Sequence, residues 1–159
     1  MRRMRVFNIH EPEFSYDDTD PEPYRAGMDR FGSKLGATRI GASIYELPPG
    51  QSICPYHYEY GEEEWLMVLT GTPTVRTPEG TSELRAGDVV CFGEGPESAH
   101  KVTNSSDEAL RVMMLSTHAW PAATVYPDSD KIAIWPAKGS EDAVIVRRSD
   151  KREYYDGEL

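Results

Sequence analysis

One stretch decides the fold: residues 54–71, which read CPYHYEYGEEEWLMVLTG. Side chains alternate between the two faces of a β-strand, so His57 and Glu59 lie on one face. Glu64 has the same parity as the apolar residues that follow it, so this acid points in the direction of the core. Gly61 allows a bend between the two segments, after which Glu64 returns to the side of His57. The stretch therefore predicts strands that carry polar, chemically active side chains into a protein interior.

Further short strands follow on both sides of this stretch. They are separated by turn signals such as Pro48-Pro49-Gly50 and Pro78-Glu79-Gly80, and no segment has a convincing helical period. Short strands at this spacing are typical of an all-β sandwich or barrel. The expected strands cover residues 40–47, 65–70, 74–77, 81–85, 89–92, 100–103 and 110–116.

A second histidine is expected to face the core from a distant strand. Lys101 and Thr103 form the polar outward set of that strand, so His100 points inward. Two imidazoles and nearby carboxylates inside a barrel suit a divalent first-row metal ion, because buried charges need partners. The candidate metal ligands are His57, Glu59, Glu64 and His100. Glu59 is either a ligand or a solvated acid of the run that ends at Glu64.

Other polar residues near these candidates have simpler interpretations. Glu62 and Glu63 are expected to form a solvated rim rather than to bind an ion. His10 and His118 have no supporting spacing and are interpreted as surface residues.

The chain resembles the cupin superfamily over residues 40–117. The residues that fit its two sequence motifs are His57, Glu64 and Gly71 in the first, and Gly87, Gly95, His100 and Asn104 in the second. The first motif of the family has a second histidine where this chain has Glu59. The usual cupin site has three histidines and one glutamate, so the donor set of this chain differs. The activity of other cupins therefore does not carry over to this chain directly.

The resemblance implies a double-stranded β-helix, the cupin jelly-roll barrel, with N- and C-terminal extensions. The single domain is expected to span 1–159, with an arm over 1–38, the barrel over 39–117 and the extension over 118–159. One divalent metal ion, Mn, Fe, Ni or Zn, is the implied cofactor.

Three classes of function are compatible with this pattern. Cupins include dioxygenases, sugar and sugar-phosphate isomerases and decarboxylases, so a metal-dependent enzyme of oxygenase, isomerase or lyase type would act on a small oxygenated molecule. No catalytic residue is assigned, although Glu59 is the one candidate general base if it does not bind metal. The alternative is a non-catalytic module that binds or senses a small ligand. The third is a metal-free structural protein.

Composition limits the partners of the chain. It has 159 residues and a net charge of -10, so nucleic acid and anionic membrane surfaces are not expected partners. The sequence has no signal-peptide pattern and no apolar run long enough to span a bilayer, which predicts a cytoplasmic protein.

Cys54 and Cys91 are expected to be buried free thiols. The apolar segment 143–146 reads as a strand that needs a neighbour, which predicts a homodimer.

Overall fold

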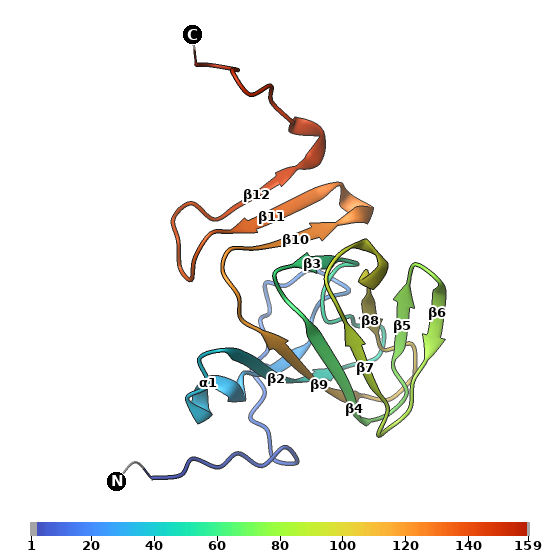
Figure 1. Ribbon diagram of the computed structural model, residues 1–159. Helices are drawn as coiled ribbons and strands as arrows, with labels where there is room; N and C mark the ends of the chain where they lie inside the picture. The colour runs from blue at the N-terminus through green and yellow to red at the C-terminus, as the bar shows by residue number, and fades with distance from the viewer. Residues whose placement is uncertain (1–2, 159) are drawn as a thin grey trace.

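Antiparallel β-strands make up most of the computed structural model, which describes residues 3–158 (Figure 1). The first six strands are β1 (Gly27–Asp29), β2 (Ile40–Leu47), β3 (Tyr58–Tyr60), β4 (Glu64–Thr70), β5 (Thr74–Thr77) and β6 (Gly80–Glu83). The others are β7 (Val89–Phe92), β8 (Lys101–Thr103), β9 (Leu110–Thr117), β10 (Ala122–Tyr126), β11 (Lys131–Trp135) and β12 (Val144–Arg147). The short helices are α1 (Phe31–Leu35) and the 3-10 turns η1 (Pro96–Ser98), η2 (Pro127–Ser129) and η3 (Arg148–Asp150).

Two curved walls enclose the core. One wall is the sheet β1-β2-β9-β4-β7, and the other combines the sheets β6-β5-β8 and β12-β11-β10-β3. An isolated bridge between His57, next to β3, and His100, next to β8, joins these two smaller sheets, and a second bridge between Ser52 and Thr103 ties the segment before β3 to β8. Apolar residues from both walls pack between them, namely Leu47, Leu66, Val75, Phe92, Val102, Leu110, Val112 and Met114. The all-β class expected from the sequence is confirmed.

The observed strands agree closely with the sequence pattern in the middle of the chain. β2, β5 and β7 have the expected bounds, β4 begins one residue early at Glu64, and β9 ends one residue late at Thr117. The expected strand 100–103 begins at Lys101, because His100 lies in an isolated bridge. β6 ends at Glu83, short of the expected limit of 85. The sequence predicted no helix, and this prediction is wrong for α1. Phe31 of this helix is buried and stacks on Phe7, with 4.6 Å between the ring centroids.

Segments outside the central strands also join the two walls. β1 lies in the expected N-terminal arm and pairs with β2. β10 lies in the expected C-terminal extension and pairs with β3, and β11 and β12 continue this sheet outward (Figure 1). Arg76 of β5 makes an ion pair of 2.6 Å with Asp128 of η2, which ties the extension to the barrel.

Two motif residues hold turns of the barrel in place. Gly71 follows β4 with φ of 77°, and a Cβ there would lie 2.5 Å from the Cβ of Leu110, so only glycine fits without movement. Asn104 is fully buried, and its amide nitrogen donates hydrogen bonds of 2.8 Å to the carbonyl oxygens of Leu47 and Glu108. Its side-chain oxygen accepts from the backbone N–H of Ser106 at 2.9 Å. These bonds fix the loop that joins β8 to β9.

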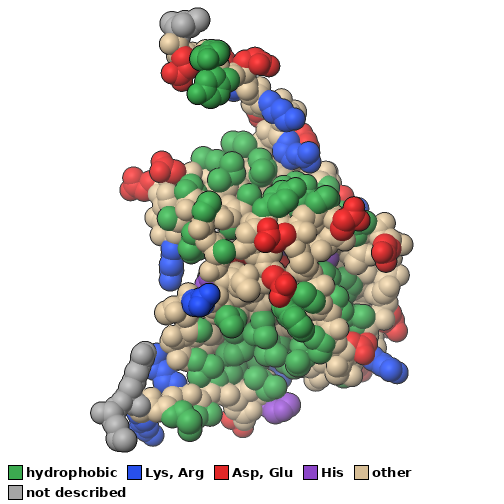
Figure 2. Space-filling view, viewed as in Figure 1, with side chains coloured by type: hydrophobic (Ala, Val, Ile, Leu, Met, Phe, Trp, Pro, Cys, Tyr) green, Lys and Arg blue, Asp and Glu red, His purple; other side chains and the backbone are tan. Residues whose placement is uncertain are grey.

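An apolar surface covers the outer side of the larger wall. Figure 2 shows hydrophobic side chains gathered there, and Trp65 and Val89 are both exposed. Cys91 pairs with Trp65 across strands β4 and β7 and shares this outer face.

Both cysteines are free, as expected, but the prediction that both are buried is wrong: Cys54 is half-buried and Cys91 is exposed. Apolar neighbours suggested burial, whereas the strand parity set by inward-facing Phe92 turns Cys91 outward.

The expected strand near residues 143–146 exists as β12, one residue later. It pairs with β11 at the end of its sheet, and Val144, Ile145 and Val146 are exposed. The homodimer that this segment suggested stays a prediction. No helix within residues 3–158 has the length and apolar character needed to cross a membrane.

Candidate metal centre

The two histidines lie side by side because the backbone pairs them directly. The N–H of His57 donates to the carbonyl of His100 at 3.1 Å, and the N–H of His100 donates to the carbonyl of His57 at 2.8 Å. Residues paired in this way in an antiparallel ladder place their side chains on the same face. The rings are 4.6 Å apart between centroids, and both side chains are buried. The join between the two smaller sheets therefore brings both imidazoles to one point.

Hydrogen bonds to the backbone fix which ring nitrogens are free. Nδ1 of His57 lies 2.9 Å from the carbonyl oxygen of Pro55, and Nδ1 of His100 lies 3.0 Å from that of Ser98. A carbonyl oxygen only accepts, so each Nδ1 carries a proton and donates it. In the neutral imidazole, the lone pair is then on Nε2, the arrangement that metal-binding histidines use.

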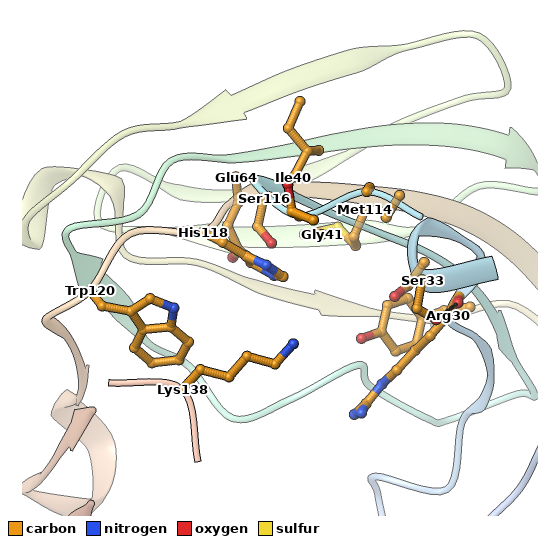
Figure 3. Close-up of a pocket in the computed structure, with 15 residues that line it drawn as sticks. Arg30, Ser33, Ile40, Gly41, Glu64, Met114, Ser116, His118, Trp120 and Lys138 are labelled. Atoms are coloured by element: carbon orange, nitrogen blue, oxygen red, sulfur yellow. Dashed lines mark hydrogen bonds between the residues drawn. The ribbon is translucent and has the colours of Figure 1, made fainter. Parts of the chain in front are cut away.

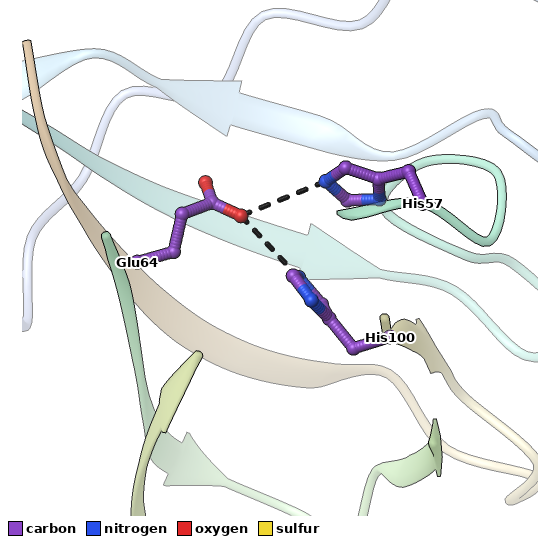
Figure 4. Close-up of side chains that lie close together, drawn as sticks. All are labelled: His57, Glu64 and His100. Atoms are coloured by element: carbon purple, nitrogen blue, oxygen red, sulfur yellow. Dashed lines mark ion pairs between the residues drawn. The ribbon is translucent and has the colours of Figure 1, made fainter. Parts of the chain in front are cut away.

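Glu64 completes a compact group of donors at the start of β4. Its Oε2 lies 3.3 Å from Nε2 of His100 and 3.6 Å from Nε2 of His57, and the three ligand atoms lie within 4.8 Å of one another (Figure 4). Nitrogen and oxygen ligands about 2.1 Å from one ion are roughly 3.0 to 3.4 Å apart, so the contact with His100 already suits a shared cation and the contact with His57 is slightly longer. Nε2 of His100 is also buried without a hydrogen-bond partner. The residues fit a divalent ion.

Without an ion, a proton takes the place of the cation. Burial lowers the pKa of His57, but the Cys54 thiol and the Glu64 carboxylate outweigh burial and raise the pKa to about 11. Burial likewise raises the pKa of Glu64, but the neighbouring imidazoles of His100 and His57 bring it down to about 2. The metal-free site is therefore an ion pair between an imidazolium and a carboxylate.

Glu59 faces the same cavity from β3 but does not join the group of three donors. Its Oε1 accepts a hydrogen bond of 3.3 Å from Thr124, and its Oε2 is buried without a partner. Burial, followed by the charge of Glu64, raises the pKa of Glu59.

Glu62 is half-buried rather than fully solvated, and burial together with Glu59 raises its pKa to about 8. Glu63 is exposed, as expected for a rim residue.

Two adjoining cavities surround these groups. The donor cavity has a volume of about 450 Å³ and contains His57, Glu59 and Glu64 in its lining. A second cavity of about 660 Å³ also reaches Glu64, and the two share Arg30. Sequence reasoning missed Arg30, because nothing in the polar arm indicates that it meets the barrel. His118 is exposed, as expected, yet it lines the second cavity.

Comparison with known proteins agrees with this architecture. Residues 43–116 match the family model described as the cupin domain. No curated protein sequence matches the chain.

Two of the solved structures with this fold match over nearly the whole chain, and a third matches over 70% of it. A putative sugar phosphate isomerase from Acidithiobacillus ferrooxidans is 21% identical, with a TM-score of 0.80 over 94% of this chain and 96% of that one. A sugar phosphate isomerase of the cupin superfamily from Silicibacter pomeroyi is 20% identical, with a TM-score of 0.79 over 95% and 98% of the two chains. A predicted oxalate decarboxylase from Thermotoga maritima is 19% identical, with a TM-score of 0.59 over 70% and 97%. These likenesses confirm the jelly-roll barrel expected from the sequence.

Proposed function

We propose that the protein, whose residues 43–116 match the family model described as the cupin domain, is a metal-dependent enzyme acting on a small oxygenated molecule. The observation that carries the proposal is the group of His57, Glu64 and His100, whose ligand atoms lie within 4.8 Å of one another. The ion would be held by the two Nε2 atoms and the Glu64 carboxylate. Mn, Fe, Ni and Zn all accept such nitrogen and oxygen donors.

Isomerase- or lyase-type proton transfer is the reaction class that the surroundings favour. A bound divalent ion supplies Lewis acidity, which polarises a carbonyl or hydroxyl oxygen. Glu59 then acts as the acid–base group: its Oε2 has no partner within the described residues, while Thr124 orients the other oxygen. In an aldose–ketose isomerisation, the carboxylate would remove the proton from the hydroxyl-bearing carbon next to the carbonyl and return it to the carbonyl carbon, while the hydroxyl proton passes through solvent to the former carbonyl oxygen. Two of the solved structures with this fold carry the name sugar phosphate isomerase.

A specific observation also favours oxygenase chemistry as the second candidate. With Glu59 outside the group, the donor set is two histidines and one carboxylate, which is the set of non-haem iron(II) oxygenases. That chemistry needs open positions on iron and does not require a carboxyl group in the role of Glu59.

Deuterium exchange separates these possibilities. The metal-loaded protein is incubated in D2O with a panel of aldose phosphates and hydroxy acids, and NMR follows the loss of C–H signals. Proton-transfer chemistry predicts exchange that stops with chelator and falls at least about 100-fold in Glu59→Gln, which keeps its metal. Glu63→Gln, an exposed acid four residues later, is the matched control and should exchange at the wild-type rate.

The other outcomes identify the competing functions. Exchange at full rate in Glu59→Gln would contradict the acid–base role. Oxygen uptake by the iron(II)-loaded protein, insensitive to Glu59→Gln, would support the oxygenase. Binding of the same compounds without exchange or oxygen uptake would support a non-catalytic binding or sensing module.

A further inference from the structure

The second cavity has a lining of opposite charge to the rest of the chain. Its polar lining includes the cations Arg30 and Lys138, the imidazole of His118, and hydroxyl groups of Ser33, Ser43 and Ser116. Glu64 is the one acidic side chain that the lining contains, and it is directed at the two histidines. In a chain with a net charge of -10, such a lining is a local reversal of sign.

The two cations come from distant parts of the chain and meet only because of the fold. Arg30 lies between β1 and α1, whereas Lys138 lies between β11 and β12. Figure 3 shows Lys138 reaching into the cavity from one side, with Arg30 on the opposite side. His118 follows β9 and lies over Gly41, where an added Cβ would be 2.7 Å from its Nε2. Glycine at this position therefore leaves the space that the imidazole occupies.

Neither cation is neutralised by the protein itself. Among residues 3–158, no carboxylate lies within ion-pair distance of Arg30 or Lys138. The Nε of Arg30 contacts only the sulfur of Met28, at 3.4 Å. Some other cations of the described residues are paired, for example Lys34 with Asp29 at 2.7 Å. Two unpaired cations and several hydroxyl groups around one cavity are the chemistry that binds a phosphate or carboxylate group.

We propose that the second cavity is an anion subsite, and that the substrate is a small oxygenated molecule bearing a phosphate or carboxylate group. Arg30 and Lys138 bind the anionic group, while the oxygen atoms at the other end of the molecule reach the donor cavity. Arg30 and Glu64 line both cavities, so the two cavities adjoin and one small molecule can extend from the first into the second. The second half of this proposal rests on the proposed function, whereas the anion subsite does not.

Metal-free protein tests the subsite separately from the metal chemistry. Inorganic phosphate is titrated into chelator-treated protein by calorimetry, with acetate as the carboxylate probe. The wild type should bind at least one of them, and the tighter one identifies the preferred anionic group. Arg30→Gln and Lys138→Gln should each weaken this binding at least about tenfold, the effect of one charge-assisted hydrogen bond.

Matched controls remove the same charge outside the cavity. Arg85→Gln changes an exposed arginine between β6 and β7, and Lys151→Gln changes an exposed lysine of the tail. Both should bind within about twofold of the wild type, because a distant exposed charge is largely screened. Equal weakening in all four variants would overturn the proposal, as would a wild type that binds neither probe. Thermal melting of each variant confirms that the fold is retained.

Discussion

Competition between a metal ion and a proton at His57 makes metal binding depend on pH. The metal-free site holds a proton on the imidazole, since the thiol of Cys54 and the carboxylate of Glu64 raise its pKa to about 11 despite burial. An ion binds the lone pair of Nε2 and must displace that proton. The change to test is a shift from pH 6 to pH 8, where the metal-free protein keeps the proton throughout.

The size of the effect follows from the proton count. One proton released per ion makes the apparent affinity rise tenfold per pH unit, or about 100-fold over two units, which is about 2.7 kcal/mol. Calorimetry with one divalent metal in buffers of different ionisation enthalpy measures both the affinity and the number of protons released. An affinity that does not change between pH 6 and pH 8, with no proton released, would refute the role of His57 as a neutral ligand.

Three further predictions concern stability and assembly. Asn104→Ala leaves the buried carbonyl of Leu47 without its donor, so we expect a loss of about 2 to 4 kcal/mol and a fall in Tm of roughly 5 to 15 °C, with exposed Asn8→Ala unchanged as the control. The pKa of Glu64 is lowered from its ordinary value of 4.5 to about 2. Its contribution to the free energy of unfolding of the metal-free protein is therefore complete above pH 4.5 and is lost as the pH falls toward 2. Urea titrations across this range should show that the pH-dependent loss of stability is smaller in Glu64→Gln. Light scattering should give about twice the chain mass of 17.9 kDa, and a monomer would count against the homodimer.

Local pattern was enough to predict the barrel strands and the inward direction of the donors. Alternation with a period of two placed Glu64 with the core residues of β4, and placed His100 on the inward side of its strand. Both assignments depend only on neighbours within one strand. The pairing of His57 with His100 is non-local, so alternation within one strand does not predict it. The resemblance in motif spacing is what led us to expect both histidines at one site.

What the sequence did not predict depends on contacts between distant segments. α1 has five residues and is stabilised by the packing of Phe31 rather than by a helical pattern. Arg30 and Lys138 are ordinary surface cations in the sequence, and only the tertiary fold brings them to one cavity. Alternation does not decide whether Glu59 is a ligand or a solvated acid. The structure places it part-buried in the cavity of the donors, and its role as a ligand stays a prediction.

The metal content of the purified protein, measured by inductively coupled plasma mass spectrometry, tests the metal centre most directly. We expect about one divalent ion per chain, retained on dialysis. The ion should be lost in His57→Ala and in Glu64→Gln, whereas His10→Ala, which removes an exposed histidine, should keep it. A wild-type protein that is metal-free and cannot be loaded with Mn, Fe, Ni or Zn would contradict the metal centre.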